Sequence, residues 1–458
     1  MSADDDRAST AGRRALVMGL GRFGGGAGAA RHLARRGFDV TVTDLSPPHE
    51  LAASLEVLDE VNVRLSLGGH RRADFERADL VVANPAVSPS SPWLAVAREH
   101  GARITSEIEL LLEALPARTV CVTGTQGKSS TCSMTAAFLA AAGFRAHLGG
   151  NLGGSLLDEL PRIAATDVVV LELSSYQLAA LADPGALPTR VEAVAVTNVL
   201  ADHLERHGTP AAYAAAKGRI LDLLVEGGVA ILPGADGKLA AWTPKRGARV
   251  DFWPEGRFGP GLFLREGLFR HDEVALGRVE DLAVPGRFQR ENALVALGLA
   301  HAIGARPTDL ERAVGAARGL EHRVEDLGLF RGRRVVDNGV STTPDSTLAA
   351  LECVPAGSTL IAGGRSKGLP LDELAAHAAR RAALAVTFGE AAAELAAAFR
   401  AAGLEALQTI TLDEAVAEAF ERTPAGGTVL FSPACASFDA YANFRERAQA
   451  FRAALPHD

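Results

Sequence analysis

The sequence predicts an α/β protein built from three domains, and three observations support this class. Short apolar runs of the kind that form buried parallel strands alternate with helix-forming segments along most of the chain. Two of these runs lead directly into glycine-bearing loops, the arrangement that holds phosphate groups in such folds. The chain has 458 residues, which suggests about three domains rather than one.

The composition indicates a folded protein that binds neither nucleic acid nor membrane. Hydrophobic residues make up 48% and charged residues 22%, which allows a large core without a bias toward disorder. The formal net charge of −8, without a long basic stripe, argues against a nucleic-acid partner. No apolar run reaches the length of a bilayer, and residues 1–6 are acidic where a signal peptide is basic. We therefore expect a cytoplasmic protein whose four cysteines are reduced thiols.

The domain boundaries follow from helix breaks and from the spacing of the strands. Pro116 ends a helical run just before the central glycine loop, so we place the first boundary near residue 107. This gives a Rossmann-like domain over residues 1–107 and a central P-loop ATPase-type α/β domain over residues 108–318. Further apolar strands separated by helices predict a second Rossmann-like domain over residues 319–458.

The first glycine-bearing loop is a weak nucleotide signal. An apolar strand turns on Gly19 and Gly21 into a helix, and the next strand ends at Asp44, which is the βαβ layout of a nucleotide-binding half. With Gly24, these glycines match the dinucleotide fingerprint. The fingerprint fits the cofactor of a nicotinamide-dependent oxidoreductase, but it equally fits any domain that holds a diphosphate at a helix N-terminus.

The second loop is the clearer phosphate site. Gly124 and Gly127 allow a tight turn with inward N–H groups between the strand at residues 119–122 and a helix-forming run at residues 132–142. Lys128 would reach the β and γ phosphates of a nucleotide, and the Ser129 hydroxyl would bind its magnesium. Only two residues separate the glycines where the usual P-loop has four, so this loop alone leaves a simple helix cap as an alternative.

Three polar residues downstream are candidates for the same site. Glu172 ends an apolar strand, where it could cap the next helix or bind magnesium beside the phosphate loop. His203 follows the next strand, although lone histidines are mostly structural. Lys217 lies in a helix that begins near Pro210, where a lysine is ordinarily a solvated surface charge.

Seven segments resemble the Mur ligase family over nearly the whole chain. They are residues 124–129, 150–153, 171–177, 198–203, 217–220, 321–323 and 432–438. The resemblance implies that the first domain binds a UDP-sugar, the second ATP and the third an amino acid. It also implies that Lys217 is carbamylated, because an unmodified ammonium beside two magnesium ions would be repelled.

The resemblance implies a set of site residues for each substrate. The implied catalytic residues are Lys128, Glu172, His203 and Lys217, and the implied metal-site residues are Ser129, Glu172, His203 and carbamylated Lys217. The implied ATP contacts are Gly124, Thr125, Gln126, Gly127, Lys128, Ser129, Ser130, Asn292, Arg323 and Asp337. The implied UDP-sugar contacts are Gly21, Arg22, Phe23, Asp44, Asn84, Asn151, Ser174 and Gln177. The implied amino-acid contacts are Thr342, Lys367, Ser437, Phe438 and Phe444.

The implied activity is an ATP-dependent amide ligation in peptidoglycan precursor synthesis. A monomer with ATP and two Mg²⁺ ions would phosphorylate the terminal carboxylate of UDP-N-acetylmuramoyl-L-alanine, and the amine of D-glutamate would attack the acyl phosphate. The sequence departs from the family pattern at Val340, where a lysine is usual, and at Asn338, where an acid is usual and Asp337 is the possible replacement. L-Glutamate or another acidic amino acid is therefore the alternative substrate.

Overall fold

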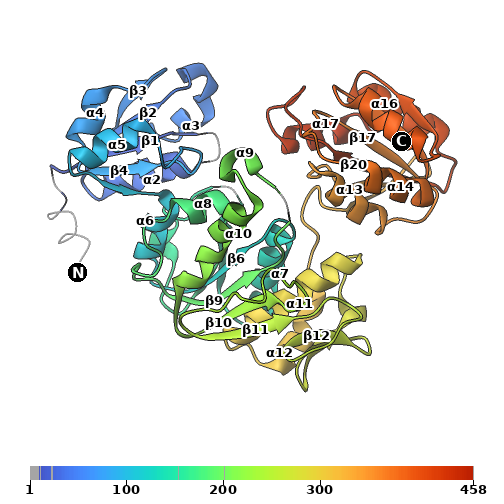
Figure 1. The fold of residues 1–458 in the computed structure, drawn as a ribbon, viewed down its shortest axis with the longest axis horizontal. Coiled ribbons are helices and arrows are strands. Elements are labelled where there is room, and N and C mark those ends of the chain that lie inside the picture. Colours follow the sequence, from blue (N-terminus) through green and yellow to red (C-terminus); the bar gives the residue numbers. More distant parts are fainter. Residues whose placement is uncertain (1–9, 11, 22–23, 153, 201, 457–458) are drawn as a thin grey trace. The chain divides into compact units, whose positions relative to one another are not determined.

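The computed structural model describes residues 10, 12–21, 24–152, 154–200 and 202–456. The chain forms two compact units (Figure 1). The first comprises Met1–Leu282 with Glu291–Ala317, and the second comprises Ala283–Arg290 with Arg318–Asp458. The described part contains three β-sheets, two in the first unit and one in the second, each with helices packed against it. The predicted three-domain α/β class is confirmed.

The first sheet is a five-stranded parallel sheet in the order β3-β2-β1-β4-β5. Its strands are β1 (Arg14–Met18), β2 (Asp39–Asp44), β3 (Arg64–Leu67), β4 (Leu80–Ala83) and β5 (Arg103–Thr105). Its helices are α2 (Gly25–Arg35), α3 (Ala52–Glu56), α4 (Arg72–Arg77) and α5 (Pro92–Glu99). Alternate residues of β1 enter different hydrophobic clusters, because successive side chains of a strand point to opposite faces. Both faces of the sheet are therefore covered.

The second sheet has nine strands in the order β14-β13-β12-β11-β10-β9-β6-β8-β7. The strands are β6 (Arg118–Thr123), β7 (Ala146–Gly150), β8 (Val168–Glu172), β9 (Val191–Val196), β10 (Leu224–Pro233), β11 (Ala248–Phe252), β12 (Leu262–Arg265), β13 (Leu268–His271) and β14 (Val274–Arg278). The run of short strands over residues 229–278, whose sequence suggests a meander, forms one only from β12 to β14, because β10, β11 and β12 pair in parallel. The functional loops lie at the other end of the sheet order, around β6, β8 and β9.

Seven α-helices precede, separate or follow the strands of the second sheet along the described chain. They are α6 (Glu107–Ala114), α7 (Lys128–Ala141), α8 (Ser175–Ala180), α9 (Leu204–His207), α10 (Pro210–Gly218), α11 (Arg287–Ala302) and α12 (Pro307–Ala313). Apolar residues of α6 belong to one hydrophobic cluster with residues of β1 and β8. The first two sheets therefore share a continuous core within the first unit. Short 3-10 helices occur at Pro48–Glu50, Leu160–Arg162, Arg219–Leu223, Val279–Asp281 and Val314–Ala316.

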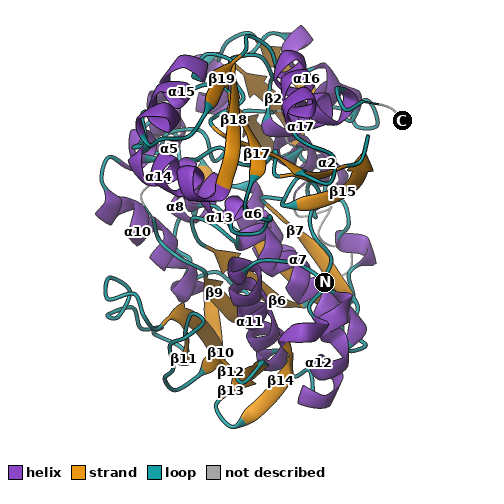
Figure 2. Cartoon of the chain, turned by 90° about the vertical axis from the view of Figure 1, so that its right-hand side faces the viewer, coloured by secondary structure: helices purple, strands orange, loops and turns teal. Residues whose placement is uncertain are grey.

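The third sheet, in the second unit, has six strands in the order β15-β16-β20-β17-β18-β19, and only its edge strand β15 is antiparallel. The strands are β15 (Glu325–Phe330), β16 (Arg333–Asp337), β17 (Ser358–Gly363), β18 (Ala382–Phe388), β19 (Ala406–Gln408) and β20 (Thr428–Ala434). One cluster packs α13 (Pro344–Leu351), α14 (Asp372–Arg381) and α15 (Ala392–Ala401) on one face, as Figure 2 shows. The other packs α16 (Leu412–Arg422) and α17 (Phe444–Ala453) on the opposite face.

Two further observations concern the chain as a whole. Across the described ranges, no helix combines the length and apolar character needed to cross a membrane. All four cysteines are free thiols, three of them buried and Cys353 partly buried. Burial raises the pKa of Cys353 to about 12, so its thiol stays protonated and unreactive at neutral pH.

Candidate active site

The glycine loop between β6 and α7 leads directly into the helix, and its two glycines cannot be replaced without a collision. The helix begins at Lys128, four residues earlier than the sequence predicts, so Lys128 and Ser129 lie in its first turn at the positive end of the helix dipole. Gly127 caps the helix in the left-handed conformation with φ of 81°. A side chain at Gly124 would collide with Thr197, and one at Gly127 would collide with the Asn292 amide. Only glycine fits at both positions.

The two residues that follow β9 hold the same loop through hydrogen bonds to its backbone. The Asn198 carbonyl accepts from the Thr125 N–H at 3.0 Å. The Asn198 side chain accepts from the Gln126 N–H at 2.9 Å and donates to its carbonyl at 3.1 Å. The Thr197 hydroxyl donates to the Gln126 carbonyl at 2.5 Å. The sequence did not predict this role for Asn198, although the residue lies in one of the family-like segments.

Lys217 is buried against the glycine loop. Its side chain is 2% exposed, and its Nζ donates to the Gly124 carbonyl at 2.6 Å and lies 4.6 Å from the Tyr213 ring centroid. Burial, with a smaller contribution from the Lys128 charge, lowers the pKa of Lys217 to about 7, although Asp202 and Glu172 oppose the shift. The alternative that Lys217 is a solvated surface charge is therefore wrong. An amine with this pKa is partly neutral, and to that extent nucleophilic, at neutral pH.

Glu172 offers a buried carboxylate oxygen to the same region. One oxygen accepts from the Asn151 amide at 3.0 Å, and the other is buried without a hydrogen-bond partner among the described residues. Leaving such an oxygen unpaired is costly, and a divalent cation would satisfy it. The helix-cap alternative is wrong, because the cap of α8 is Ser174.

Ser174 and Gln177, both expected to contact the UDP-sugar, form a capping box at the start of α8. The Ser174 hydroxyl accepts from the Gln177 N–H at 3.2 Å, and the Gln177 side chain accepts from the Ser174 N–H at 2.9 Å. This box places the start of α8 directly after the strand that carries Glu172. Their role toward substrate stays a prediction.

His203 lies in a short, tightly folded segment before α9. Its backbone is left-handed with φ of 51°, and its N–H donates to the Asp202 carboxylate at 2.9 Å. Its ring meets the Tyr176 ring edge-on with a centroid distance of 5.2 Å, and the Tyr213 ring lies 6.2 Å away. Two aromatic rings therefore limit how the imidazole can rotate.

The first sheet brings Gly21, Asp44 and Asn84 to its carboxyl edge. Asp44 accepts from the Gly21 N–H at 3.2 Å, and Asn84 donates to the Gly19 carbonyl at 3.3 Å. Carboxyl edges of open parallel sheets are where ligands bind. Arg22 and Phe23, which were also expected here, lie outside the described residues.

The remaining ATP contacts divide between the two units. Asn292, on α11, faces the loop and accepts from the Thr131 hydroxyl at 3.4 Å, and Ser130 is buried in the first turn of α7. Arg323 belongs to the second unit and precedes β15. Its contact with nucleotide stays a prediction.

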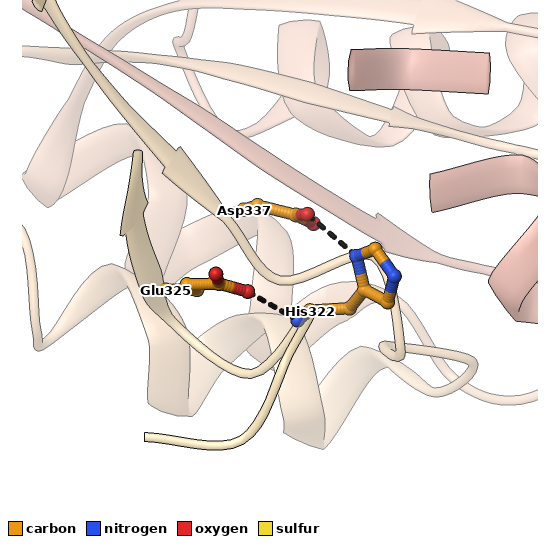
Figure 3. A group of neighbouring side chains, drawn as sticks. All are labelled: His322, Glu325 and Asp337. Carbon is orange, nitrogen blue, oxygen red and sulfur yellow. Dashed lines mark hydrogen bonds and ion pairs between the residues drawn. The ribbon is translucent and has the colours of Figure 1, made fainter. Parts of the chain in front are cut away.

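Asp337 is fixed inside the second unit by a network that the sequence did not predict. It accepts from His322 Nδ1 at 2.7 Å, from Arg452 Nε at 2.9 Å and from the Gly339 N–H at 2.8 Å. Figure 3 shows it with His322 and Glu325, a group whose ligand atoms are close enough to hold a metal. Arg452 also binds Glu325, so a guanidinium already supplies the positive charge. We interpret the group as an ion-pair network that anchors the segment before β15.

The residues expected to contact the amino acid lie at the carboxyl edge of the third sheet. Lys367 Nζ donates to the Thr342 hydroxyl at 3.5 Å. Ser437 is buried, Phe438 is 63% exposed, and Phe444 begins α17. Asn338 donates to the Ser432 hydroxyl at 2.9 Å.

Arg447 is a residue of this region that the sequence reasoning missed. Its guanidinium is fully buried and donates to four backbone carbonyls, those of Gly339, Ser341, Gly363 and Cys435. These carbonyls belong to three segments at one edge of the sheet, the loop after β16, the last residue of β17 and the loop after β20. Arg447 therefore ties together the segments that carry several of the residues expected to contact the amino acid.

Comparison with known proteins defines the class. The Mur ligase middle domain model matches residues 122–300, and the model of the MurD-like N-terminal domain of Mur ligases matches residues 13–106. The fold is similar to that of UDP-N-acetylmuramate-alanine ligase MurC from Thermotoga maritima, with a TM-score of 0.62 at 18% identity, covering 96% of this chain and 98% of that one. It is also similar to MurF from Acinetobacter baumannii, with a TM-score of 0.61 at 16% identity, covering 97% and 91%. The class is that of the three-domain, ATP-dependent Mur ligases.

Sequence relatives narrow the class further. A protein of Roseiflexus sp. (strain RS-1) named UDP-N-acetylmuramoylalanine–D-glutamate ligase is 38% identical over 460 residues, covering 96% of this chain and 98% of the relative. One of the same name from Geotalea uraniireducens (strain Rf4) is 35% identical over 444 residues, covering 96% of both. The chain belongs to the Mur ligase family, in its MurD-like branch. This membership decides against the nicotinamide-dependent oxidoreductase.

Proposed function

We propose that this enzyme joins D-glutamate to UDP-N-acetylmuramoyl-L-alanine at the expense of ATP, a step of peptidoglycan precursor synthesis. The names of its full-length relatives support the substrates. The observation that carries the chemistry is the buried Lys217 amine, held 2.6 Å from the carbonyl of a phosphate-loop glycine and acted on by the charges of Lys128 and Glu172. A buried amine beside a phosphate loop has little structural value, but it suits a metal-dependent phosphoryl transfer.

The residues of this edge fit magnesium. Glu172 offers an unpaired, buried carboxylate oxygen, and the hydroxyl of Ser129 adds a second hard oxygen donor. We propose that these residues, with His203 and modified Lys217, hold two magnesium ions. Bound magnesium would neutralise charge on the transferring phosphoryl group.

Carbamylation gives Lys217 its role. The neutral amine would attack the carbon of CO₂, forming an N–C bond as one C=O π bond opens onto oxygen, and releasing one proton, so that a neutral amine becomes a carbamate anion. The pKa of about 7 favours this step, because an ordinary lysine, near 10.5, is almost fully protonated at neutral pH. The carbamate would then offer magnesium negatively charged oxygen ligands, which the amine lacks.

The residues of the chain would assist two reactions, the transfer of a phosphoryl group from ATP and the transfer of the acyl group to glutamate. Lys128, in the first turn of α7, would neutralise the β and γ phosphates while the alanine carboxylate attacks the γ phosphorus and ADP leaves. The neutral amine of glutamate then attacks the acyl carbon, a tetrahedral intermediate forms, and it collapses with loss of phosphate and a proton. Positioning and charge neutralisation carry this catalysis, and no nucleophilic side chain takes part.

The amino-acid site supports D-glutamate and one alternative. Lys367 and Thr342 are in contact and supply a cation and a hydroxyl for a side-chain carboxylate. Val340 places an apolar side chain in the same loop, so L-glutamate is the second candidate. We also propose that the enzyme works as a cytoplasmic monomer, because one chain carries all the expected substrate residues and both nucleotide substrates are cytoplasmic.

An isotope experiment tests the proposed chemistry. UDP-N-acetylmuramoyl-L-alanine labelled with ¹⁸O in its terminal carboxylate is incubated with ATP, Mg²⁺ and D-glutamate. Carboxylate activation transfers one ¹⁸O atom to inorganic phosphate and yields the amide, both detected by mass spectrometry. Product without ¹⁸O in the phosphate would contradict an acyl phosphate.

A further inference from the structure

Arg206, on α9 and three residues after His203, joins the two sheets of the first unit. Its Nη2 donates to the carbonyls of Pro85 at 3.0 Å and Val87 at 2.8 Å, and its Nη1 donates to the carbonyl of Ala86 at 3.2 Å. A single guanidinium thus binds three consecutive carbonyls of the loop that follows β4. Only the planar fork of arginine offers enough fixed N–H donors for such a set.

The loop that Arg206 binds belongs to the expected nucleotide-sugar site. Asn84 begins the loop, donates to the Gly19 carbonyl at 3.3 Å and accepts from the Ala86 N–H at 3.0 Å. The loop is therefore tied to the first glycine turn at the carboxyl edge of the first sheet. A ligand bound against that turn would set the positions of the carbonyls that Arg206 holds.

On its other side, Arg206 is connected to His203, a proposed metal-site residue, by a series of aromatic contacts. The guanidinium carbon lies 5.2 Å from the Tyr176 centroid, and Tyr176 meets the ring of His203 edge-on at 5.2 Å. Tyr176 also contacts His207, which in turn lies 5.4 Å from Tyr213. The contact series ends at the phosphate loop, because the Tyr213 and Thr125 hydroxyls are 3.0 Å apart.

We infer that Arg206 is a positioning residue that couples occupation of the nucleotide-sugar site to the metal and phosphate site. When the sugar nucleotide orders the loop after β4, the guanidinium is fixed over Tyr176, and Tyr176 holds the His203 ring in one orientation. The two ligands then favour each other's binding, as linkage requires. The inference rests on the proposed function, because it names the ligand of the first site from that proposal.

Binding measurements test the coupling directly. Calorimetry gives the affinity of UDP-N-acetylmuramoyl-L-alanine with and without Mg²⁺ and a non-hydrolysable ATP analogue, and the ratio of the two affinities is the coupling factor. We expect a factor of about 5 or more in the unmodified enzyme, within the usual range for coupled sites. In Arg206→Ala the factor falls to one, and in Arg206→Lys, which keeps the charge but loses the fork, it is intermediate.

A matched control separates coupling from general stability. Arg162 is exposed and pairs with Glu159 on the surface of the same unit, so Arg162→Ala should keep the coupling factor of the unmodified enzyme. Guanidinium ion added to Arg206→Ala should partly restore the factor, and it should have no effect on Arg162→Ala. An unchanged coupling factor in Arg206→Ala would overturn the inference.

The design also separates this inference from the proposed function. If the unmodified enzyme turns over and Arg206→Ala keeps the same coupling factor, the proposed function holds and the coupling role of Arg206 is refuted. If the unmodified enzyme does not bind UDP-N-acetylmuramoyl-L-alanine, UDP replaces it as the probe. Loss of coupling to UDP in Arg206→Ala would then support the role of Arg206 while the proposed substrate falls, and absence of UDP coupling in the unmodified enzyme would overturn the inference.

Discussion

At the scale of single residues, the unusual group is Lys217. A lysine that is 2% exposed loses most of its hydration, and the nearby Lys128 charge adds to the cost of protonating it. A structural role would not require a lysine at this position, since an apolar side chain would fill the space without that cost. The residue therefore lends itself to tests that separate its chemistry from its packing.

Replacement of Lys217 should remove activity without unfolding the protein. We expect Lys217→Ala to lower the rate of ligation by roughly a thousandfold, as removal of a main transition-state contact does. Lys128→Ala should have an effect of the same size. The control is Lys245→Ala, because Lys245 is 81% exposed and pairs with Asp222. Near-normal turnover of folded Lys217→Ala, measured by phosphate release, would contradict the carbamate role.

The lowered pKa of Lys217 also predicts a dependence on pH and CO₂. Below its pKa of about 7 the amine is protonated and cannot attack CO₂, so enzyme stripped of CO₂ should recover activity with bicarbonate at pH 8 and recover little at pH 6. Between about 7 and 10.5 the unfolded chain binds more protons at this site than the folded one, so the unmodified lysine favours unfolding less as pH rises. NMR with ¹³C-labelled bicarbonate follows carbamate formation. Equal recovery at both pH values would contradict the prediction.

Residue patterns predicted part of the candidate site and missed the rest for a physical reason. Gly124, Gly127 and Lys128 were predictable because a strand, a tight turn and a helix end are local features. The burial of Lys217 against Gly124 depends on a contact across 93 residues, which no local pattern encodes. Arg206 and Arg447 were missed because their partners are backbone carbonyls, and a sequence does not show where a distant backbone will lie.

At the scale of elements, the glycine loop and helix α7 form one structural unit, because the last glycine of the loop caps the helix. The sequence predicted the strand and the loop, but it placed the helix start at Cys132, because Ser129, Ser130 and Thr131 are weak helix formers. The structure begins the helix at Lys128, since the left-handed Gly127 caps it there. Tertiary context overrides propensity at this helix end.

Two glycines at opposite ends of α7 provide a matched pair of variants. Both have positive φ, 81° at Gly127 and 92° at Gly143, so an alanine should cost about 1–2 kcal/mol of strain at either. At Gly127 the added methyl also collides with Asn292, whereas at Gly143 it meets open space. We expect Gly143→Ala to lower only stability and Gly127→Ala to raise the KM for ATP as well. Equal KM values in the two variants would contradict the role of the loop.

Arg447, on helix α17, should contribute both to the stability of the second unit and to the binding of glutamate. Arg447→Met removes bonds to four carbonyls in three segments of the chain, and we expect a loss of about 3 kcal/mol from the free energy of unfolding with weaker binding of glutamate. The exposed Gln449 on the same helix, replaced by alanine, should change neither quantity. Denaturant unfolding and the KM for glutamate measure the two effects, and a fully stable Arg447→Met would refute the assignment.

At the scale of the whole molecule, the expected ligand residues are spread over three sheets. The order of those sheets along the chain was predictable, because strand and helix signals alternate. The order of strands within each sheet was not, as the parallel pairing of β10 with β11 illustrates, since pairing is set by contacts between distant segments.

Bound nucleotide should stabilise the chain as a whole. At a hundred times its Kd, Mg²⁺–ATP should add about 2.7 kcal/mol to the stability of the folded state and raise the melting temperature. EDTA should remove most of the shift, and NADH should produce none. A thermal shift with NADH but not with ATP would return the first glycine loop to the oxidoreductase alternative.

The central claim is tested most directly by ATP-dependent phosphate release with UDP-N-acetylmuramoyl-L-alanine, run in parallel with D-glutamate and L-glutamate. We predict release with D-glutamate alone, which would make Val340 a tolerated change in a D-glutamate ligase. Release with L-glutamate alone would contradict the proposed substrate and make the segment around Val340 the determinant of specificity, and silence with both would contradict the proposed ligation itself.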